Sequence, residues 1–519
     1  MLHRFILRFI LTLVMLAGLL TASPAQRPAV HAQNAPQKYL IVSPDEFADV
    51  LADFISVQQE RGFQVQLALL SQTGTAKEQI KSFIQRTFPR PKYVLLVGDD
   101  EHIPAWPFTT SASPSARTDL YYTTFDSGYR PDTILGRLPV HNETDLVNYL
   151  AKLTAYYRMK EVPPWEQQIS FIASDHGSIA SDTEGQFEDI ISAHTTPTGY
   201  SGTFTGHGGA IAPIAGGDRL FPVTYKAVHS DVISAINRGS AAIVYIGPGK
   251  MTTWDWNAGP FLTVGDVQAF DGPPIPLVLA LAPDTADFAA PVSMADAWML
   301  NAQSGALTYV GASAGTINIT DRELAHGFFN TEFSDFSTPL SVGESLKTAL
   351  YILDEFFYPG TGAKTEYESY QLFGDPSLTF RRPQGARLTT PKTYLPAGWG
   401  VDFTFPVSVM NPGETTEAFD LTIQSSAEQV VSLNTYFLPS LSPGESQVVV
   451  ATILLSTDYE VGTSDHVTIT AIQGSNELIK TQIIVTLQTF DPSISFPLLK
   501  RIPGTKTLRH LAAAVGIIQ

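Results

Sequence analysis

Two apolar runs that stop abruptly constrain the fold of this chain more than any other feature. Ala241–Ile246 and Pro276–Ala282 are short and almost wholly apolar, as in strands that are buried on both faces of a parallel sheet. The first run ends at Gly247-Pro248-Gly249, and the second ends at Pro283-Asp284. Parallel α/β folds carry their chemistry in loops at the carboxyl edge of the sheet, so we expect any functional site at these two loops.

Alternating strand and helix patterns precede these runs. The segment from 38 to 99 reads as strand, helix, strand, helix, strand, which predicts a parallel sheet with right-handed crossovers. The residues between Arg117 and Arg137 are predicted to form a loop, and Pro163-Pro164-Trp165 marks a boundary before a second unit of the same kind. The predicted strands are Lys38–Ser43, Phe63–Leu70, Lys92–Asp99, Gln168–Ser174 and Gly305–Gly311, and the predicted helices are Asp45–Gly62, Ala76–Phe88, Glu143–Met159, Thr183–Ala193, Tyr225–Asn237, Met294–Ser304 and Gly343–Phe357.

From about Arg387 the pattern changes. Short alternating runs such as Val401–Val409 and His466–Ile472 are separated by turn signals, including Asn411-Pro412-Gly413 and Ser442-Pro443-Gly444. Regular short strands without a helical period predict a β-sandwich of roughly 100 residues.

The composition excludes several classes of function. The chain has no cysteine, which excludes disulfides, thiolate metal sites and a cysteine nucleophile. Its net charge of -18 argues against nucleic acid and anionic membranes as partners.

The N-terminus has the layout of a secretory signal. Arg4 and Arg8 precede the apolar run Phe9–Leu20, and small residues follow. This run is shorter than the roughly 20 residues that a spanning helix needs. We therefore expect a secreted or cell-surface protein with no membrane span after the signal is removed.

Many short segments, in one order, resemble the gingipain-type cysteine peptidases, a caspase-like α/β group. The resemblance covers roughly residues 38–382. Its segments are Val97-Gly98-Asp99, Asp119–Tyr122, Asp132–Pro139, Asp182–Phe187, Ile236–Ser240, Tyr245–Gly249, Trp254, Asp296-Ala297-Trp298, Gly305-Ala306 and Leu372–Leu378.

The resemblance implies the fold class: two caspase-like parallel-sheet α/β subdomains followed by an immunoglobulin-like β-sandwich. The expected divisions are a signal peptide (1–32), an N-terminal α/β subdomain (33–162), a gingipain-like catalytic-type α/β subdomain (163–386), the β-sandwich (387–490) and a C-terminal tail (491–519). It also implies an exported endopeptidase in which a cysteine attacks the peptide carbonyl and a histidine exchanges the proton.

The sequence departs from that family at both catalytic positions. The resemblance places the histidine at Pro248 and the cysteine at Pro283. Proline cannot act as a base or nucleophile, and Pro283 also lacks the N–H that would help to bind the oxyanion. We therefore predict that no intact catalytic dyad exists, with Gly247, Gly249, Trp254 and Asp284 as remnants of the site loops.

Other residues could substitute only weakly. His207 lies in a Gly-rich loop upstream of a helix, and neither Ser293 nor Ser313 sits in a nucleophile-elbow pattern. Trp254 and Trp256 could line a groove, although core packing is favoured. No cofactor is expected to be required; structural Ca²⁺ is a family property for which the acid-rich loops Asp119–Asp132 and Asp175–Glu188 are candidates, against the simpler interpretation of solvated surface acids.

Three functions remain open at this stage. The first is an inactive relative of gingipain-type peptidases that binds a protein or peptide ligand or acts as a scaffold. The second is an active secreted endopeptidase that uses residues other than those of the family. The third is a surface adhesion protein that acts through its β-sandwich.

Overall fold

The computed structural model describes residues 36–490, apart from short gaps at 161, 177–179, 258, 289–291, 334–338, 358, 380, 384, 392–393, 399–401, 414, 455–463 and 475. The predicted signal peptide (1–32) and C-terminal tail (491–519) lie outside the described residues. Within the described residues, no helix combines the length and apolar character that a bilayer crossing requires.

The N-terminal part of the chain forms the predicted βαβαβ unit. Strand β1 (Lys38–Ser43) pairs in parallel with β2 (Gln64–Leu69) on one side and β3 (Tyr93–Val97) on the other. Helices α2 (Ala52–Glu60) and α4 (Lys77–Arg86) connect them. Helix α2 begins later than predicted, because Asp45–Phe47 forms a separate 3₁₀ turn.

A single ten-stranded sheet joins the two predicted α/β subdomains. Its order is β2-β1-β3-β6-β15-β14-β13-β9-β7-β8, and β15 is antiparallel to β14 but parallel to β6, which links the two halves. The other strands are β6 (Ile134–Leu138), β7 (Ile169–Ala173), β8 (Asp218–Leu220), β9 (Ala242–Ile246), β13 (Ile275–Leu281), β14 (Ala306–Ala312) and β15 (Tyr370–Gly374).

Strand β6 corrects the prediction of a loop over Arg117–Arg137. Its sequence, Ile-Leu-Gly-Arg-Leu, does not read as an apolar run because it includes Gly136 and Arg137. Each residue makes a contact outside the strand that explains why it is present. A Cβ on Gly136 would lie 2.4 Å from the Gly374 carbonyl oxygen. The Arg137 guanidinium is buried and paired with Asp119 at 2.6 Å.

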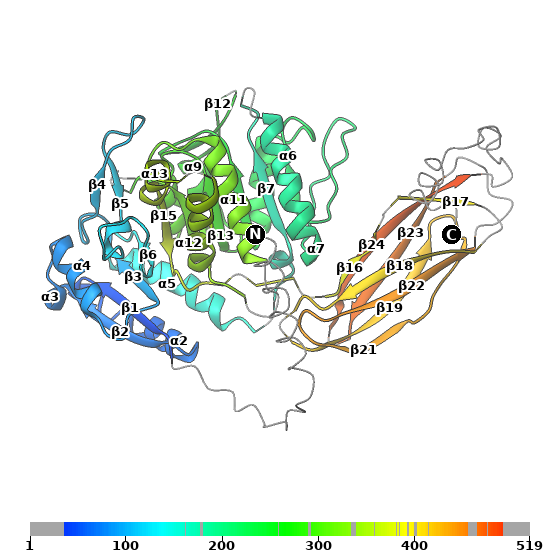
Figure 1. The fold of residues 1–519 in the computed structure, drawn as a ribbon, viewed down its shortest axis with the longest axis horizontal. Coiled ribbons are helices and arrows are strands. Elements are labelled where there is room, and N and C mark those ends of the chain that lie inside the picture. The colour runs from blue at the N-terminus through cyan, green and yellow to red at the C-terminus, as the bar shows by residue number, and fades with distance from the viewer. Residues whose placement is uncertain are drawn as a thin grey trace, which may run out of the picture. The chain divides into compact units, whose positions relative to one another are not determined.

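Helices cover both faces of the sheet (Figure 1). Helix α5 contacts α2 and α10 on one face, whereas α11 contacts α6 and α12 on the other. Helix α11 follows β14 and was not predicted from the sequence. The bounds are α5 Glu143–Arg158, α6 Ala180–Ile190, α8 His229–Arg238, α9 Val264–Gln268, α10 Met294–Leu300, α11 Asn318–Glu332, α12 Val342–Ile352 and α13 Thr361–Ser369.

The C-terminal part is a β-sandwich, as predicted. Alternate residues such as Val407 and Val409 from one sheet and Val467 and Ile469 from the other are buried in one common core. The first sheet has the order β16 (Arg387–Thr389), β18 (Asp402–Met410), β22 (Ser446–Leu454) and β20 (Val430–Leu433); the second has β17 (Tyr394–Gly398), β24 (Asn476–Phe490), β23 (Ser464–Gln473), β19 (Glu417–Ser425) and β21 (Phe437–Leu441).

Candidate functional site

The loops that contain Pro248 and Pro283 lie side by side at the carboxyl edge of the sheet. Strands β9 and β13 are parallel neighbours, with Ile246 opposite Leu281 at their last residues. The Gly247 amide donates to the Leu281 carbonyl at 3.4 Å. A Cβ on Gly249 would lie 2.9 Å from the Pro283 carbonyl oxygen, so glycine is what allows the two loops to pack closely.

The Pro248 loop is held by a small antiparallel sheet. Strand β10 (Gly249–Lys250) pairs with β11 (Thr253–Trp256), which pairs with β12 (Gly259–Thr263). The Pro248 carbonyl accepts hydrogen bonds from the Tyr245 hydroxyl at 2.7 Å and from the Asp255 amide at 3.0 Å. These bonds fix the backbone of the loop without any polar group on the Pro248 side chain.

Trp254 belongs to the core beneath this loop. Its indole is fully buried and stacks on Tyr245, with ring centroids 4.6 Å apart, and on Trp298 at 5.9 Å. Core packing was the favoured interpretation of its role, and the structure agrees with it. Trp256 is half-buried, and its indole N–H donates to the Ala173 carbonyl at 3.0 Å.

The loop after Pro283 is tied to a hairpin from the N-terminal part of the chain. Asp284 has a left-handed backbone (φ 60), and its amide donates to the Ala314 carbonyl at 3.1 Å. The Ser113 hydroxyl donates to Asp284 Oδ1 at 2.7 Å and accepts from the Gly315 amide at 2.8 Å. Ser113 lies between strands β4 (Trp106–Phe108) and β5 (Ala116–Thr118).

Sequence reasoning missed Ser113. It lies in a run of serine, threonine, alanine and one proline (109–116) that has the composition of an ordinary surface loop. Nothing in that run distinguishes Ser113 from Ser111 or Ser115. Its place beside Asp284 depends on a contact across 171 residues.

The arrangement at the two strand ends offers little to acyl transfer. Neither proline side chain can donate, accept or attack, and neither residue has an amide hydrogen. The next amide after Pro283, that of Asp284, is already bound to Ala314. The polar side chain nearest in sequence is the Asp284 carboxyl group, which in its ionised form would oppose the negative charge of an oxyanion.

A model of peptidase family C25 matches residues 32–381. The chain belongs to this family. The match covers both halves of the ten-stranded sheet and stops before the β-sandwich.

Relatives within family C25 are distant in sequence. Lys-gingipain from Porphyromonas gingivalis is 24% identical over 251 residues, which is 46% of this chain and 13% of that protein. Among solved structures, the arginine-specific cysteine proteinase gingipain R matches with a TM-score of 0.57 and 17% identity, covering 90% of this chain and 100% of that one. A structure described as a protease matches with a TM-score of 0.57 and 18% identity, covering 87% of this chain and 98% of that one. These structural likenesses show the fold.

The three residues that were considered as substitutes for the family's catalytic residues, and disfavoured, form polar contacts elsewhere. His207 Nε2 lies 2.8 Å from Asp231 Oδ2 at the start of α8. The Ser293 hydroxyl donates to Asp296 Oδ2 at 3.0 Å in a helix cap, and the Ser313 hydroxyl donates to the Arg117 carbonyl at 2.7 Å. Both serines are buried. None of these polar contacts involves either proline loop.

Three acids in the loops considered for Ca²⁺ form ion pairs. Asp119 pairs with Arg137, Asp132 Oδ1 with Arg90 at 2.9 Å, and Glu188 with Arg219 at 2.8 Å. Among the described residues, no group of three histidine, aspartate or glutamate side chains is arranged to hold a metal ion. Structural Ca²⁺ is therefore not part of our proposal.

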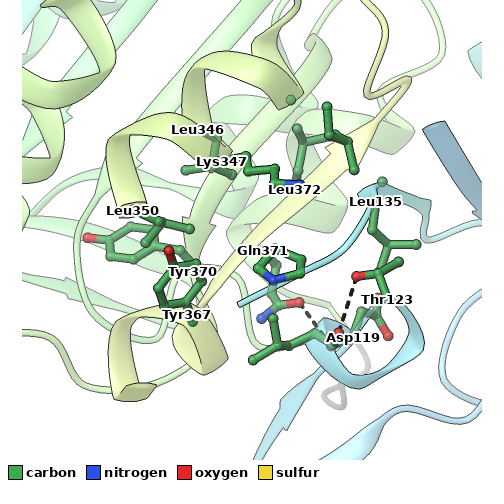
Figure 2. Close-up of a pocket in the computed structure, with 15 residues that line it drawn as sticks. Asp119, Thr123, Leu135, Leu346, Lys347, Leu350, Tyr367, Tyr370, Gln371 and Leu372 are labelled. Atoms are coloured by element: carbon green, nitrogen blue, oxygen red, sulfur yellow. Dashed lines mark hydrogen bonds between the residues drawn. The ribbon is translucent and has the colours of Figure 1, made fainter. Parts of the chain in front are cut away.

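A small pocket lies on the sheet face beneath α12 and α13 (Figure 2). Its volume is about 70 Å³, below the roughly 300–1,000 Å³ of typical ligand sites. Leu346, Leu350 and Leu372 contribute apolar walls, and burial lowers the pKa of Lys347 at one side. We interpret this space as a packing void between the helices and strands β6 and β15.

Proposed function

We propose that this C25 family member is an exported protein without peptidase activity that acts by binding a protein or peptide. One observation carries the proposal: Pro248 and Pro283 lie at the adjacent ends of β9 and β13. The family resemblance assigns the catalytic histidine and cysteine to these two positions.

Acyl transfer by a cysteine peptidase has three separate requirements. A cysteine peptidase needs a thiolate, a proton-exchanging partner and amide donors for the oxyanion. Proline at position 283 provides neither the thiolate nor its amide donor. Proline at position 248 provides no proton-exchanging side chain. Loss of a single oxyanion donor typically costs about 2.7–4 kcal/mol of transition-state stabilisation, and loss of the nucleophile ends the mechanism.

The intact loop architecture supports binding as the retained role. The strand ends meet, Tyr245 stacks on Trp254, and both loops are fixed by backbone hydrogen bonds. The signal-like N-terminus supports export. The chain matches only 13% of the length of Lys-gingipain, so the activity of that whole protein is not transferred.

A peptidase assay with a restored dyad tests the proposal. The purified chain is incubated with casein and with Lys- and Arg-containing peptides, with reductant and Ca²⁺ present. We expect no cleavage by the natural sequence and measurable cleavage by Pro248→His with Pro283→Cys. The matched control, Pro248→His with Pro283→Ala, should stay inactive because it lacks the thiol. Thermal melts establish that all three proteins are folded.

Cleavage by the natural sequence would contradict the proposal. Variants Ser113→Ala, His207→Ala, Ser293→Ala and Ser313→Ala then identify which side chain, if any of these, substitutes for the family's residues. A serine-directed phosphonate adduct would locate a serine nucleophile directly.

A further inference from the structure

A second, larger cavity lies against the start of α5, the end of α9 and one side of α10. Its volume is about 630 Å³, within the range of small-molecule sites. The lining includes carboxylates from Asp145 and Asp296, the His141 imidazole, and apolar walls from Phe270 and Leu300, with no lysine or arginine. Neither Pro248 nor Pro283 lines it; Val292, at the far end of the loop that follows Pro283, does.

Asp296 is the buried polar group in this cavity. Its side chain is 4% exposed, and its Oδ2 accepts hydrogen bonds from the Ser293 amide at 2.9 Å and the Ser293 hydroxyl at 3.0 Å. Its second oxygen, Oδ1, accepts no hydrogen bond from any residue that the structure describes, and no described cation pairs with the carboxylate. Asp296 therefore lines the cavity and has one carboxylate oxygen that accepts no hydrogen bond from a described residue.

A buried carboxylate with one oxygen left without a hydrogen bond is costly. Moving an ionised group out of water is unfavourable unless a cation or several hydrogen-bond donors replace the water. Burial raises the pKa of Asp296 to about 6, so the group is still ionised at neutral pH. A cation delivered from solution would supply the partner that no described residue provides.

The surroundings of Asp296 add negative potential. His141 Nδ1 lies 3.3 Å from Asp145 Oδ2, and its Nε2 lies 4.0 Å from Asp99 Oδ2. This imidazole is thus placed between two carboxylates. Three aspartates gather at this end of the cavity, with a histidine as the nearby group that can carry positive charge.

We propose that this cavity binds an organic cation, an ammonium or guanidinium group on a short aliphatic stem. Asp296 pairs with the charged head, and the apolar walls at Phe270 and Leu300 contact the stem. A metal ion is disfavoured because the described residues provide no three-ligand group. The cation has two sources, a free amine or a Lys or Arg side chain of a peptide. The proposal does not depend on the state of the proline loops.

Calorimetric titration of the full chain tests the site. Agmatine and butylamine are titrated in phosphate buffer at neutral pH, with butanol as the uncharged analogue. We expect heat from both amines and none from butanol. Asp296→Asn keeps an acceptor for Ser293 but removes the charge, and should weaken amine binding by about tenfold or more.

A matched control is available in the adjacent helix. Asp266 has the same capping role in α9, with its Oδ2 2.9 Å from the Thr263 amide and 2.7 Å from the Thr263 hydroxyl, but it does not line the cavity. Asp266→Asn should leave amine binding unchanged. If Asp296→Asn proves unfolded, Ala302→Trp at the exposed rim provides a second variant, which should block binding by filling the cavity.

Other results of the titrations would overturn the proposed site or identify the source of the cation. Absence of binding by either amine, or equal binding by the natural sequence and Asp296→Asn, would overturn the proposal. Displacement of agmatine by Ca²⁺ that depends on Asp296 would overturn the choice of an organic cation. Tighter binding of acetyl-Ala-Lys-Ala-amide than of butylamine supports a peptide source, and the reverse order supports a free amine. Binding should weaken as the pH falls through about 6, where Asp296 gains its proton.

Discussion

The Tyr39 hydroxyl donates to Asp375 Oδ1 at 2.8 Å, across 336 residues of sequence. Tyr39 lies in β1, and Asp375 follows β15. In chain order these are the first and last strands of the ten-stranded sheet. The Tyr157 hydroxyl donates to Asp375 Oδ2 at 2.6 Å, and Gln58 and Ser377 donate as well. The carboxylate is fully buried and links β1, α2 and α5.

We expect Asp375→Ala to destabilise the fold by about 3–5 kcal/mol, because it leaves several buried donors without an acceptor. Urea unfolding followed by circular dichroism measures the change. The control is Asp53→Ala, which removes an exposed ion pair with Arg158 and should cost about 1 kcal/mol or less. Similar losses for the two variants would contradict the assigned role of Asp375.

The bond between Ser113 and Asp284 gives a second prediction. Asp284→Ala removes the acceptor for the Ser113 hydroxyl and places alanine at φ 60, so it should destabilise the fold by about 1–3 kcal/mol. Asp284→Asn keeps an acceptor oxygen and tolerates the left-handed backbone, so it should be nearly neutral. Equal effects of the two substitutions, measured by urea unfolding, would argue against this contact.

The buried carboxyl groups of Asp321 and Glu366 predict that the stability of the fold depends on pH. Burial raises the pKa of Asp321 from 3.8 to about 7, and burial with the neighbouring Asp321 raises that of Glu366 from 4.5 to about 8. The Tyr370 and Thr316 hydroxyls donate to Asp321, and the Thr320 hydroxyl donates to Glu366. Oε2 of Glu366 has no hydrogen-bond partner among the described residues.

Stability falls with rising pH because the folded state holds these protons to a higher pH than the unfolded state does. Below the unfolded pKa values both states are protonated, and the stabilising contribution is complete. As the pH rises toward 7–8 the unfolded chain ionises first, so stability falls by up to about 1.4 kcal/mol per pH unit for each group. Glu366→Gln should flatten this decline and be more stable than the natural chain at about pH 8. Urea unfolding across this range decides it; an unchanged slope would contradict the prediction.

The stacked indole of Trp254 gives a fourth prediction. Trp254→Ala should cost about 3–5 kcal/mol, because it opens a cavity among fully buried side chains. Trp256→Ala, at a half-buried position, should cost clearly less. Thermal unfolding of both variants compares them. A neutral Trp254→Ala would indicate a groove-lining residue instead.

The sequence was most informative where local pattern and tertiary role coincide. β9 and β13 were predicted because apolar runs that end at Gly or Pro have few other interpretations. The same logic found β1, β3 and the β-sandwich strands. It failed for β6, because Gly136 and Arg137 interrupt the apolar run for reasons that lie in β15 and in Asp119.

In the site, too, some features could be predicted from the sequence and others depend on tertiary contacts. The chain has no cysteine, and the resemblance to the family assigned the catalytic histidine and cysteine to Pro248 and Pro283; both inferences needed only the sequence. The turn at Asp375 was also predicted, but its carboxylate was assigned no role. Its partners Tyr39 and Tyr157 lie more than 200 residues away in sequence, and no local pattern indicates these contacts.

By itself, the sequence determined the fold class and the absence of a cysteine mechanism, because periodicity and residue chemistry are local properties. Only the tertiary structure decided that the two proline loops touch, that Ser113 reaches Asp284, and that Asp296 lines a cavity with no cationic partner among the described residues. These are contacts between segments far apart along the chain. They depend on the register of one sheet and the packing of its helices, which residue types alone do not specify.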